Sequence, residues 1–189
     1  RLYEPAATAG AEALDYFVAR DLDGSAAYLR AWLARCRFEQ GRWAEAERLA
    51  AAVPAGRAVA TLAADCVRGR IRARRGDPDA WPPLDRAREL AERTGSLQRI
   101  APVAAARAEA RWLAGQPPDD DLRDAYELAA GKRNAWAAGE LGFWMWRHGL
   151  LDALPEFASE PYRLHAGGDP GAAELDCERE GLLACRHGA

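Results

Sequence analysis

Four glycines recur at nearly equal intervals along the chain, and this recurrence limits the possible folds more than any other feature of the sequence. They are Gly41, Gly76, Gly115 and Gly149, separated by 35, 39 and 34 residues. Each lies between two stretches whose apolar residues repeat at helical spacing, and glycine readily ends a helix in the left-handed conformation. A period of this length predicts helical hairpins stacked in a row, because each hairpin buries its apolar face only against its neighbours.

The segment 27–53 shows the hairpin pattern clearly. One side of its first helix carries the apolar residues Tyr28, Trp32, Leu33 and Cys36. Gly41 ends that helix. The apolar face of the second helix consists of Trp43, Ala46, Leu49, Ala50 and Val53. Two such helices joined by a short turn predict an antiparallel pair.

The same pattern predicts the remaining helices. Further first helices are expected at 57–74, 99–113 and 134–146. Second helices are expected at 81–93, 122–130 and, as a short element, 150–154. We expect regular hairpins over 14–154 and an irregular C-terminal end over 155–189, which includes one more helical stretch at 172–185. Because no segment alternates apolar and polar residues as a half-buried strand does, the predicted fold is all-α, a single domain (1–189) of about eight to ten helices stacked as a helical-hairpin solenoid.

The charge of the chain argues against nucleic-acid binding. Every one of its 26 basic residues except Lys132 is arginine, yet the formal net charge is -3. Affinity for duplexes comes largely from neutralising phosphates, so we expect no direct contact with nucleic acid. No run approaches the roughly 20 apolar residues of a membrane helix, and the first five residues contain no apolar segment of the signal-peptide type. We therefore expect a cytoplasmic chain that makes no membrane contact.

Residues suited to catalysis or metal binding are sparse. No two of the four cysteines have the two-residue spacing of a zinc site, and Cys185 with His187 is a pair of ligands without a matching second pair. The three serines and three histidines form no recognisable nucleophile and base. The acidic run 119–121 precedes a helix, where it is expected to cap the helix and complement its dipole. We expect no enzyme activity, no metal and no cofactor.

Four strings in the sequence resemble a known group of proteins. They are RGDPDAW (75–81), LQRIAPVAAARAEA (97–110), RWLAG (111–115) and WAAGELGFW (136–144). They look like the tetratricopeptide-repeat region of large bacterial ATPase-type regulators, many of them LuxR-type transcriptional regulators. The resemblance covers roughly residues 14–165 and implies a tetratricopeptide-like, regulatory helical-repeat segment. Because the chain contains neither a phosphate-binding glycine-rich loop nor a terminal DNA-reading helix pair, the ATPase and DNA-binding activities of that group are not expected here.

The tryptophans fall into two sets. Trp32, Trp43, Trp81 and Trp112 occur where one helix of a repeat packs on the next, and they are expected to fill the core. The second set surrounds a helix too densely for one face: Trp136, Phe143, Trp144, Met145 and Trp146. Either this helix is enclosed on several sides, or one ring is exposed and marks a partner or ligand surface.

Charged residues on the apolar first helices are the second candidate feature. Arg107, Glu109 and Arg111 lie on one such helix, and Glu140 and Arg147 on another. Ion pairs between helices and solvated faces are the simpler interpretation. The functional alternative is a polar groove that holds an acidic peptide or a small anion, because first helices line the concave face of helical stacks. The predicted partner or ligand groove comprises Arg107, Arg111, Trp136, Glu140, Trp144, Trp146 and Arg147.

Two functional hypotheses follow. The first is a non-catalytic scaffold for protein–protein interaction or signal relay, which docks a peptide, a neighbouring domain or a second copy of itself. Its expected anchors are Arg111, Trp144 and Trp146. The second is a sensor domain that binds a small-molecule effector in a cavity near the fourth hairpin.

Overall fold

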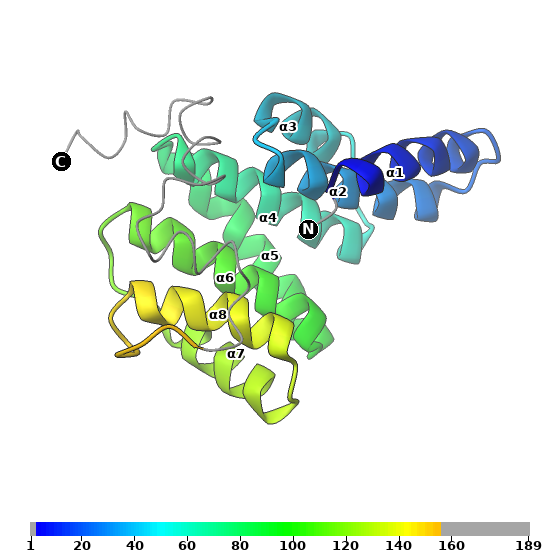
Figure 1. Ribbon diagram of the computed structural model, residues 1–189. Helices are drawn as coiled ribbons and strands as arrows, with labels where there is room; N and C mark the ends of the chain where they lie inside the picture. The colour runs from blue at the N-terminus through cyan, green and yellow to red at the C-terminus, as the bar shows by residue number, and fades with distance from the viewer. Residues whose placement is uncertain (1–2, 156–189) are drawn as a thin grey trace.

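The computed structural model describes residues 3–155, and over that range the chain is all-α, without a strand (Figure 1). Eight α-helices follow one another: α1 (Tyr3–Val18), α2 (Asp23–Glu39), α3 (Trp43–Ala51), α4 (Ala58–Arg74), α5 (Trp81–Thr94), α6 (Leu97–Leu113), α7 (Asp120–Gly131) and α8 (Ala135–Arg147). A single 3-10 turn, η1 (Pro78–Ala80), precedes α5. The all-α prediction is confirmed.

The four regularly spaced glycines end helices as expected. Gly41, Gly76, Gly115 and Gly149 have φ angles of 74°, 70°, 67° and 72°, each two residues beyond the last residue of α2, α4, α6 or α8. These left-handed conformations strain a side chain but not glycine. The periodicity in the sequence therefore reports a real backbone requirement at each turn.

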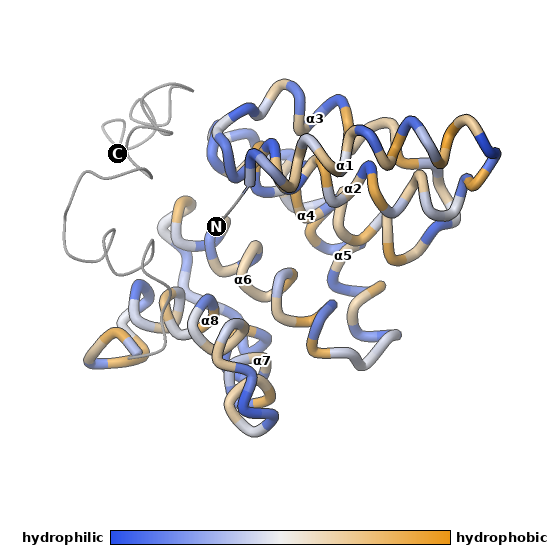
Figure 2. The backbone as a smooth tube through the Cα atoms, turned by 45° about the vertical axis from the view of Figure 1, so that its right-hand side comes forward, coloured by the Kyte–Doolittle hydropathy of each residue, from blue (hydrophilic) through white to orange (hydrophobic). Residues whose placement is uncertain are grey.

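Each helix packs mainly against helices one or two places away in the chain. Helix α2 packs against α4, α4 against α6, and α6 against α8. Helix α3 contacts both α2 and α4, α5 contacts α4 and α6, and α7 contacts α6 and α8. The result is a row of the first helices α2, α4, α6 and α8, with α3, α5 and α7 each packed against two consecutive members of it (Figure 1). Each helix shows both hydrophilic and hydrophobic segments (Figure 2).

Small residues allow close approach within this row. Helix α6 buries nearly every residue from Ala101 to Ala110 because it contacts four other helices. On α4, Gly69 lies so close to Leu84 that an added Cβ would be 2.6 Å from its Cδ2. The interiors are thus built from alanine and glycine as much as from large apolar residues, and they have little room for added atoms.

Helix α1 begins at Tyr3, before the range 14–154 in which we expected regular hairpins, and its buried residues are the small Ala7 and Gly10, which give no strong apolar periodicity. The prediction of a short helix at 150–154 was wrong, because these residues form no helix. Instead, Leu150, Leu151 and Leu154 pack against the core between α6 and α8, and Pro155 lies against Gly142 with no room for a side chain there. A proline also disfavours the helical conformation of the residue before it.

Several other predictions concern residues 156–189, which lie outside the described residues: the stretch 172–185, the irregular C-terminal end, Cys185 and His187. None of the helices within residues 3–155 combines the length and apolar composition that crossing a membrane requires.

Candidate functional site

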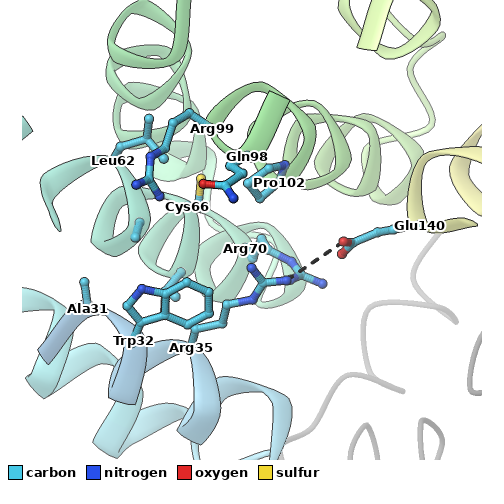
Figure 3. Close-up of a pocket in the computed structure, with 12 residues that line it drawn as sticks. Ala31, Trp32, Arg35, Leu62, Cys66, Arg70, Gln98, Arg99, Pro102 and Glu140 are labelled. Carbon is cyan, nitrogen blue, oxygen red and sulfur yellow. Dashed lines mark ion pairs between the residues drawn. The ribbon is translucent and has the colours of Figure 1, made fainter. Parts of the chain in front are cut away.

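The first helices together line a shallow groove, here called the inner groove (Figure 3). Its walls come from α2, α4 and α6, with one residue from α8, and it encloses about 60 Å³. The residues that line it are Ala31, Trp32, Arg35, Leu62, Ala63, Cys66, Val67, Arg70, Gln98, Arg99, Pro102 and Glu140. Three arginines and one glutamate are among these residues.

Two of the three arginines in the inner groove have unused hydrogen-bond donors. Arg35 is 3.9 Å from a carboxylate oxygen of both Glu39 and Glu140, and it donates no hydrogen bond to a residue of 3–155. Over the same range the guanidinium group of Arg99 forms neither an ion pair nor a hydrogen bond. A guanidinium group carries five N–H donors in a fork that matches a carboxylate. Arg35 and Arg99 are therefore equipped to bind acidic groups.

An exposed aromatic surface adjoins Arg35. The Trp32 side chain is 40% exposed, against our prediction that it fills the core, and its ring centroid is 5.7 Å from the guanidinium carbon of Arg35. Tyr28 lies edge-on to Trp32 with ring centroids 6.2 Å apart. Tryptophan and arginine are the side chains that most often dominate binding energy at protein interfaces. The inner groove thus combines charge with an apolar wall.

Cys66 lies in the inner groove with Leu62 and Gln98 (Figure 3). Burial raises the pKa of its thiol to about 12, and the charges of Arg35 and Arg70 oppose this rise only in part. The thiol is the unreactive form of cysteine, because the thiolate is the nucleophile. Cys66 is therefore not an activated nucleophile.

The third arginine, Arg70, is fully engaged. Its Nε donates to Glu109 Oε2 at 2.6 Å, and its guanidinium carbon lies 4.4 Å from the ring centroid of Phe38. Arg74 donates a second hydrogen bond to Glu109. Burial alone would raise the pKa of Glu109, but the charges of Arg70 and Arg74 outweigh it and hold the pKa below its ordinary value. This cluster joins α4 to α6.

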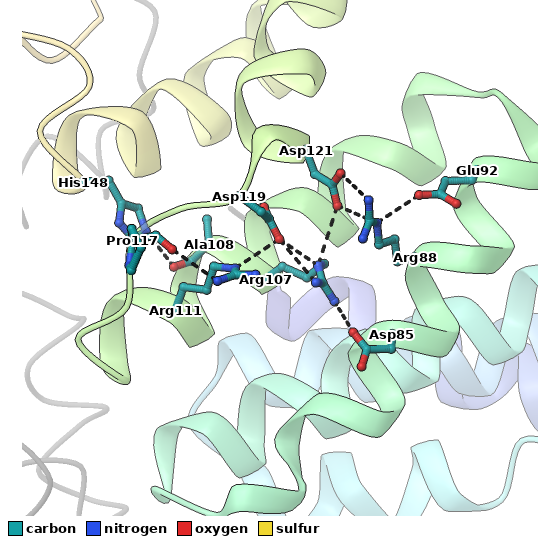
Figure 4. A network of polar contacts seen from close by, with 10 residues as sticks. All are labelled: Asp85, Arg88, Glu92, Arg107, Ala108, Arg111, Pro117, Asp119, Asp121 and His148. Atoms are coloured by element: carbon teal, nitrogen blue, oxygen red, sulfur yellow. Dashed lines mark hydrogen bonds and ion pairs between the residues drawn. The ribbon is translucent and has the colours of Figure 1, made fainter.

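Arg107 and Arg111, predicted to line a groove, instead join α6 to the start of α7 (Figure 4). Arg107 is 5% exposed, donates to Asp85 Oδ1 at 2.5 Å and shares Asp119 with Arg111, whose Nε is 3.1 Å from Asp119 Oδ2. Asp119 is the N-cap residue of α7, but its side chain does not cap the helix. Its carboxylate binds the two arginines instead, so the capping prediction for Asp119 was wrong. The simpler interpretation, ion pairs between helices, describes this pair.

Most of the dense apolar residues of α8 are enclosed by the protein, whereas the ring of Trp136 is exposed. Phe143 and Met145 are buried and Trp144 is only 7% exposed, so Trp144 fills the core between α6 and α8 and presents no ring to a partner. Trp146 and Arg147 are part of the same cluster, in which the Arg147 guanidinium carbon lies 4.4 Å from the ring centroid of Trp112.

The seven predicted site residues therefore do not form one site. Glu140 lines the inner groove, and Trp136, 55% exposed, lies one turn before it on α8. Arg35, Arg99 and Gln98 were not predicted from the sequence to be site residues, and Trp32 was predicted to fill the core. The helical spacing of Trp32 and Arg35 was the one available signal.

Comparisons of the chain with protein-family models, with curated proteins and with solved structures found no match. Within residues 3–155, no cluster of three or more histidine, cysteine, aspartate or glutamate side chains is arranged to hold a metal ion.

Proposed function

We propose that this chain is a non-catalytic helical-repeat scaffold that binds an acidic segment of a partner protein in the inner groove. The observation that carries the proposal is the pair Arg35 and Arg99, two guanidinium groups of one groove whose N–H donors no described residue satisfies. A partner carboxylate would form charge-assisted hydrogen bonds with them. The exposed ring of Trp32 beside Arg35 would receive an apolar side chain of the same segment.

The order of the helices supports a tetratricopeptide-like solenoid. Helices α2, α4, α6 and α8 pack in sequence, with α3, α5 and α7 between consecutive members, as stacked hairpins require. In such stacks the first helices form an extended binding surface. The inner groove lies on that surface.

The size of the inner groove favours a protein segment over a small-molecule effector. Small-molecule sites usually enclose several hundred Å³ and bury most of the ligand, whereas the inner groove encloses about 60 Å³. That volume accepts the ends of a few side chains from a segment lying along the surface. The aromatic residues near the fourth hairpin, where we expected an effector cavity, pack against each other and against α6.

We further propose that the scaffold relays a signal as part of, or as a relative of, a large bacterial ATPase-type transcriptional regulator. The support is the resemblance of residues 97–115, which include all of α6. The neighbouring coding sequence tests this proposal: an ATPase module upstream or a helix-turn-helix module downstream is the expected result.

The binding proposal is tested with three labelled octapeptides in which leucine alternates with glutamate, glutamine or lysine. Fluorescence anisotropy should show that the full chain binds the glutamate peptide most tightly. Arg35→Gln and Arg99→Gln should each weaken that binding about tenfold, as expected for a lost charge-assisted contact. Arg93→Gln, at a highly exposed position on α5, is the matched control. Equal binding of the three peptides, or no binding, would refute the proposal.

A further inference from the structure

We propose that Glu140 closes the inner groove from within, as an internal competitor for Arg35. Its carboxylate occupies the side of Arg35 that a partner carboxylate would use, so an acidic partner must displace it. This inference rests on the proposed function, because it concerns the regulation of that same groove.

The contact between Arg35 and Glu140 joins two helices that share no extensive packed interface. Helix α2 packs against α1, α3 and α4, whereas α8 packs against α6 and α7. The ion pair therefore reaches past α4 and α6 and crosses the groove (Figure 3). A contact of this kind adds a direct link between α2 and α8, which packing connects through α4 and α6.

The geometry of this contact suits a reversible closure. The shortest separation, from Arg35 Nη2 to Glu140 Oε2, is 3.9 Å, and no hydrogen bond joins the two groups. By contrast, Arg70 and Glu109 are 2.6 Å apart, and Arg86 and Asp65 are 2.9 Å apart. Long ion pairs without a hydrogen bond are weak. A partner carboxylate that accepts two hydrogen bonds from Arg35 would form the stronger contact.

Glu140 is placed so that its displacement opens the groove. Glu140 is 6% exposed, and the nearby charge of Arg35 offsets part of the hydration energy that its carboxylate loses on burial. Glu39, the other carboxylate near Arg35, is also paired with Arg70 at 3.4 Å and stays on α2. Displacement of Glu140 from Arg35 therefore breaks a link between α8 and α2. Displacement of Glu39 breaks no such link, because Glu39 and Arg35 are both on α2.

The first test measures binding of the alternating glutamate and leucine octapeptide to the full chain. Glu140→Gln removes the competing charge, and it should tighten binding about three- to tenfold. Glu127→Gln makes the same change on the exposed face of α7 and should leave the affinity unaltered. Unchanged or weaker binding by Glu140→Gln, with the parent chain binding normally, would overturn the competition.

The second test needs no ligand and uses the thiol of Cys66 in a chain whose other three cysteines are replaced by alanine. Its rate of reaction with a disulfide reagent reports opening of the groove. Glu140→Gln and Arg35→Gln should both raise this rate about three- to tenfold. Electrostatics alone predicts the opposite for Arg35→Gln, because the charge of Arg35 lowers the Cys66 pKa and that of Glu140 raises it.

The two tests separate the closure from the proposed function. A slower reaction of the Cys66 thiol in Arg35→Gln, or an unchanged rate in both variants, would overturn the closure whether or not the peptide binds. If neither the parent chain nor a variant binds the peptide, but the Cys66 thiol reacts faster in both Glu140→Gln and Arg35→Gln, the acidic-partner proposal fails and the closure stands.

Discussion

Arg70 and Glu109 form a 2.6 Å ion pair that ties α4 to α6. Glu109 is 3% exposed and also accepts a hydrogen bond from Arg74, so two cations share one buried carboxylate. Glu109→Gln removes the buried counter-charge that the two guanidinium groups share. We expect it to lower the free energy of unfolding at pH 7 by about 3 kcal/mol, the cost of breaking a buried pair. Urea unfolding measures this, and Glu127→Gln is the control.

The same variant should change the dependence of stability on pH. Because the folded-state pKa of Glu109 lies below its ordinary value of 4.5, its contribution is fully present above pH 4.5 and is lost as the pH falls through the folded value. The difference in stability between the parent and Glu109→Gln should therefore be constant from pH 7 to about pH 5 and narrow in more acidic solution. A difference that stays constant down to pH 2 would contradict this account.

Two helical glycines should respond in opposite ways to alanine. At Gly69 a new Cβ would be 2.6 Å from Leu84 Cδ2 and 3.2 Å from the carbonyl oxygen of Ala80, so Gly69→Ala forces α4 and α5 apart and should cost about 2 kcal/mol. At Gly131 nothing lies within 4 Å, and Gly131→Ala should stabilise the chain by about 0.5 kcal/mol. Thermal unfolding should show a lower melting temperature for Gly69→Ala and a higher one for Gly131→Ala than for the parent chain.

Substitutions at two turn positions with left-handed backbone should also change stability in opposite directions. Gly115 has a φ of 67°, so Gly115→Ala should cost about 1 kcal/mol although nothing lies near it. Arg133, which follows α7, has a φ of 52° and bears that strain already. Arg133→Gly relieves it and, after the added entropy of the unfolded chain, should gain about 0.5 kcal/mol. A loss of stability in Arg133→Gly would refute the strain argument.

Two tryptophans separate folding from binding. Trp144→Ala empties a site in the core and should destabilise the chain by about 3–5 kcal/mol. Trp32→Ala removes an exposed ring and should change stability by less than about 1 kcal/mol. Only Trp32→Ala should weaken binding of the alternating glutamate and leucine peptide while the fold persists. Urea unfolding and anisotropy on the same samples distinguish the two effects.

The sequence was sufficient to predict most helices because their ends depend on local chemistry. A glycine with positive φ ends a helix whatever surrounds it, so Gly76 and Gly115 could be interpreted without tertiary information. Helix α1 escaped prediction because it buries Ala7 and Gly10 rather than large side chains. Residues 150–154 were wrongly predicted to be helical because leucine spacing does not reveal that Pro155 will pack against Gly142.

The candidate site could not be predicted in the same way, because exposure depends on neighbouring helices. Trp32 and Trp144 are the same residue type on first helices, yet one lines the inner groove and the other lies in the core. Arg107 and Arg99 are likewise both on α6, but Asp85 and Asp119 neutralise only Arg107. Residues distant in the sequence thus determine which arginine has unpaired N–H donors.

Helix α1 packs against α2 and shares no comparable interface with another described helix. Its amide hydrogens should therefore exchange with solvent through a local opening that leaves the rest of the stack folded. Those of α6, which contacts four helices, should exchange only through opening of the larger part of the molecule. Protection from deuterium should thus rise from α1 toward α6, and unfolding followed at α1 should precede unfolding followed at Trp112.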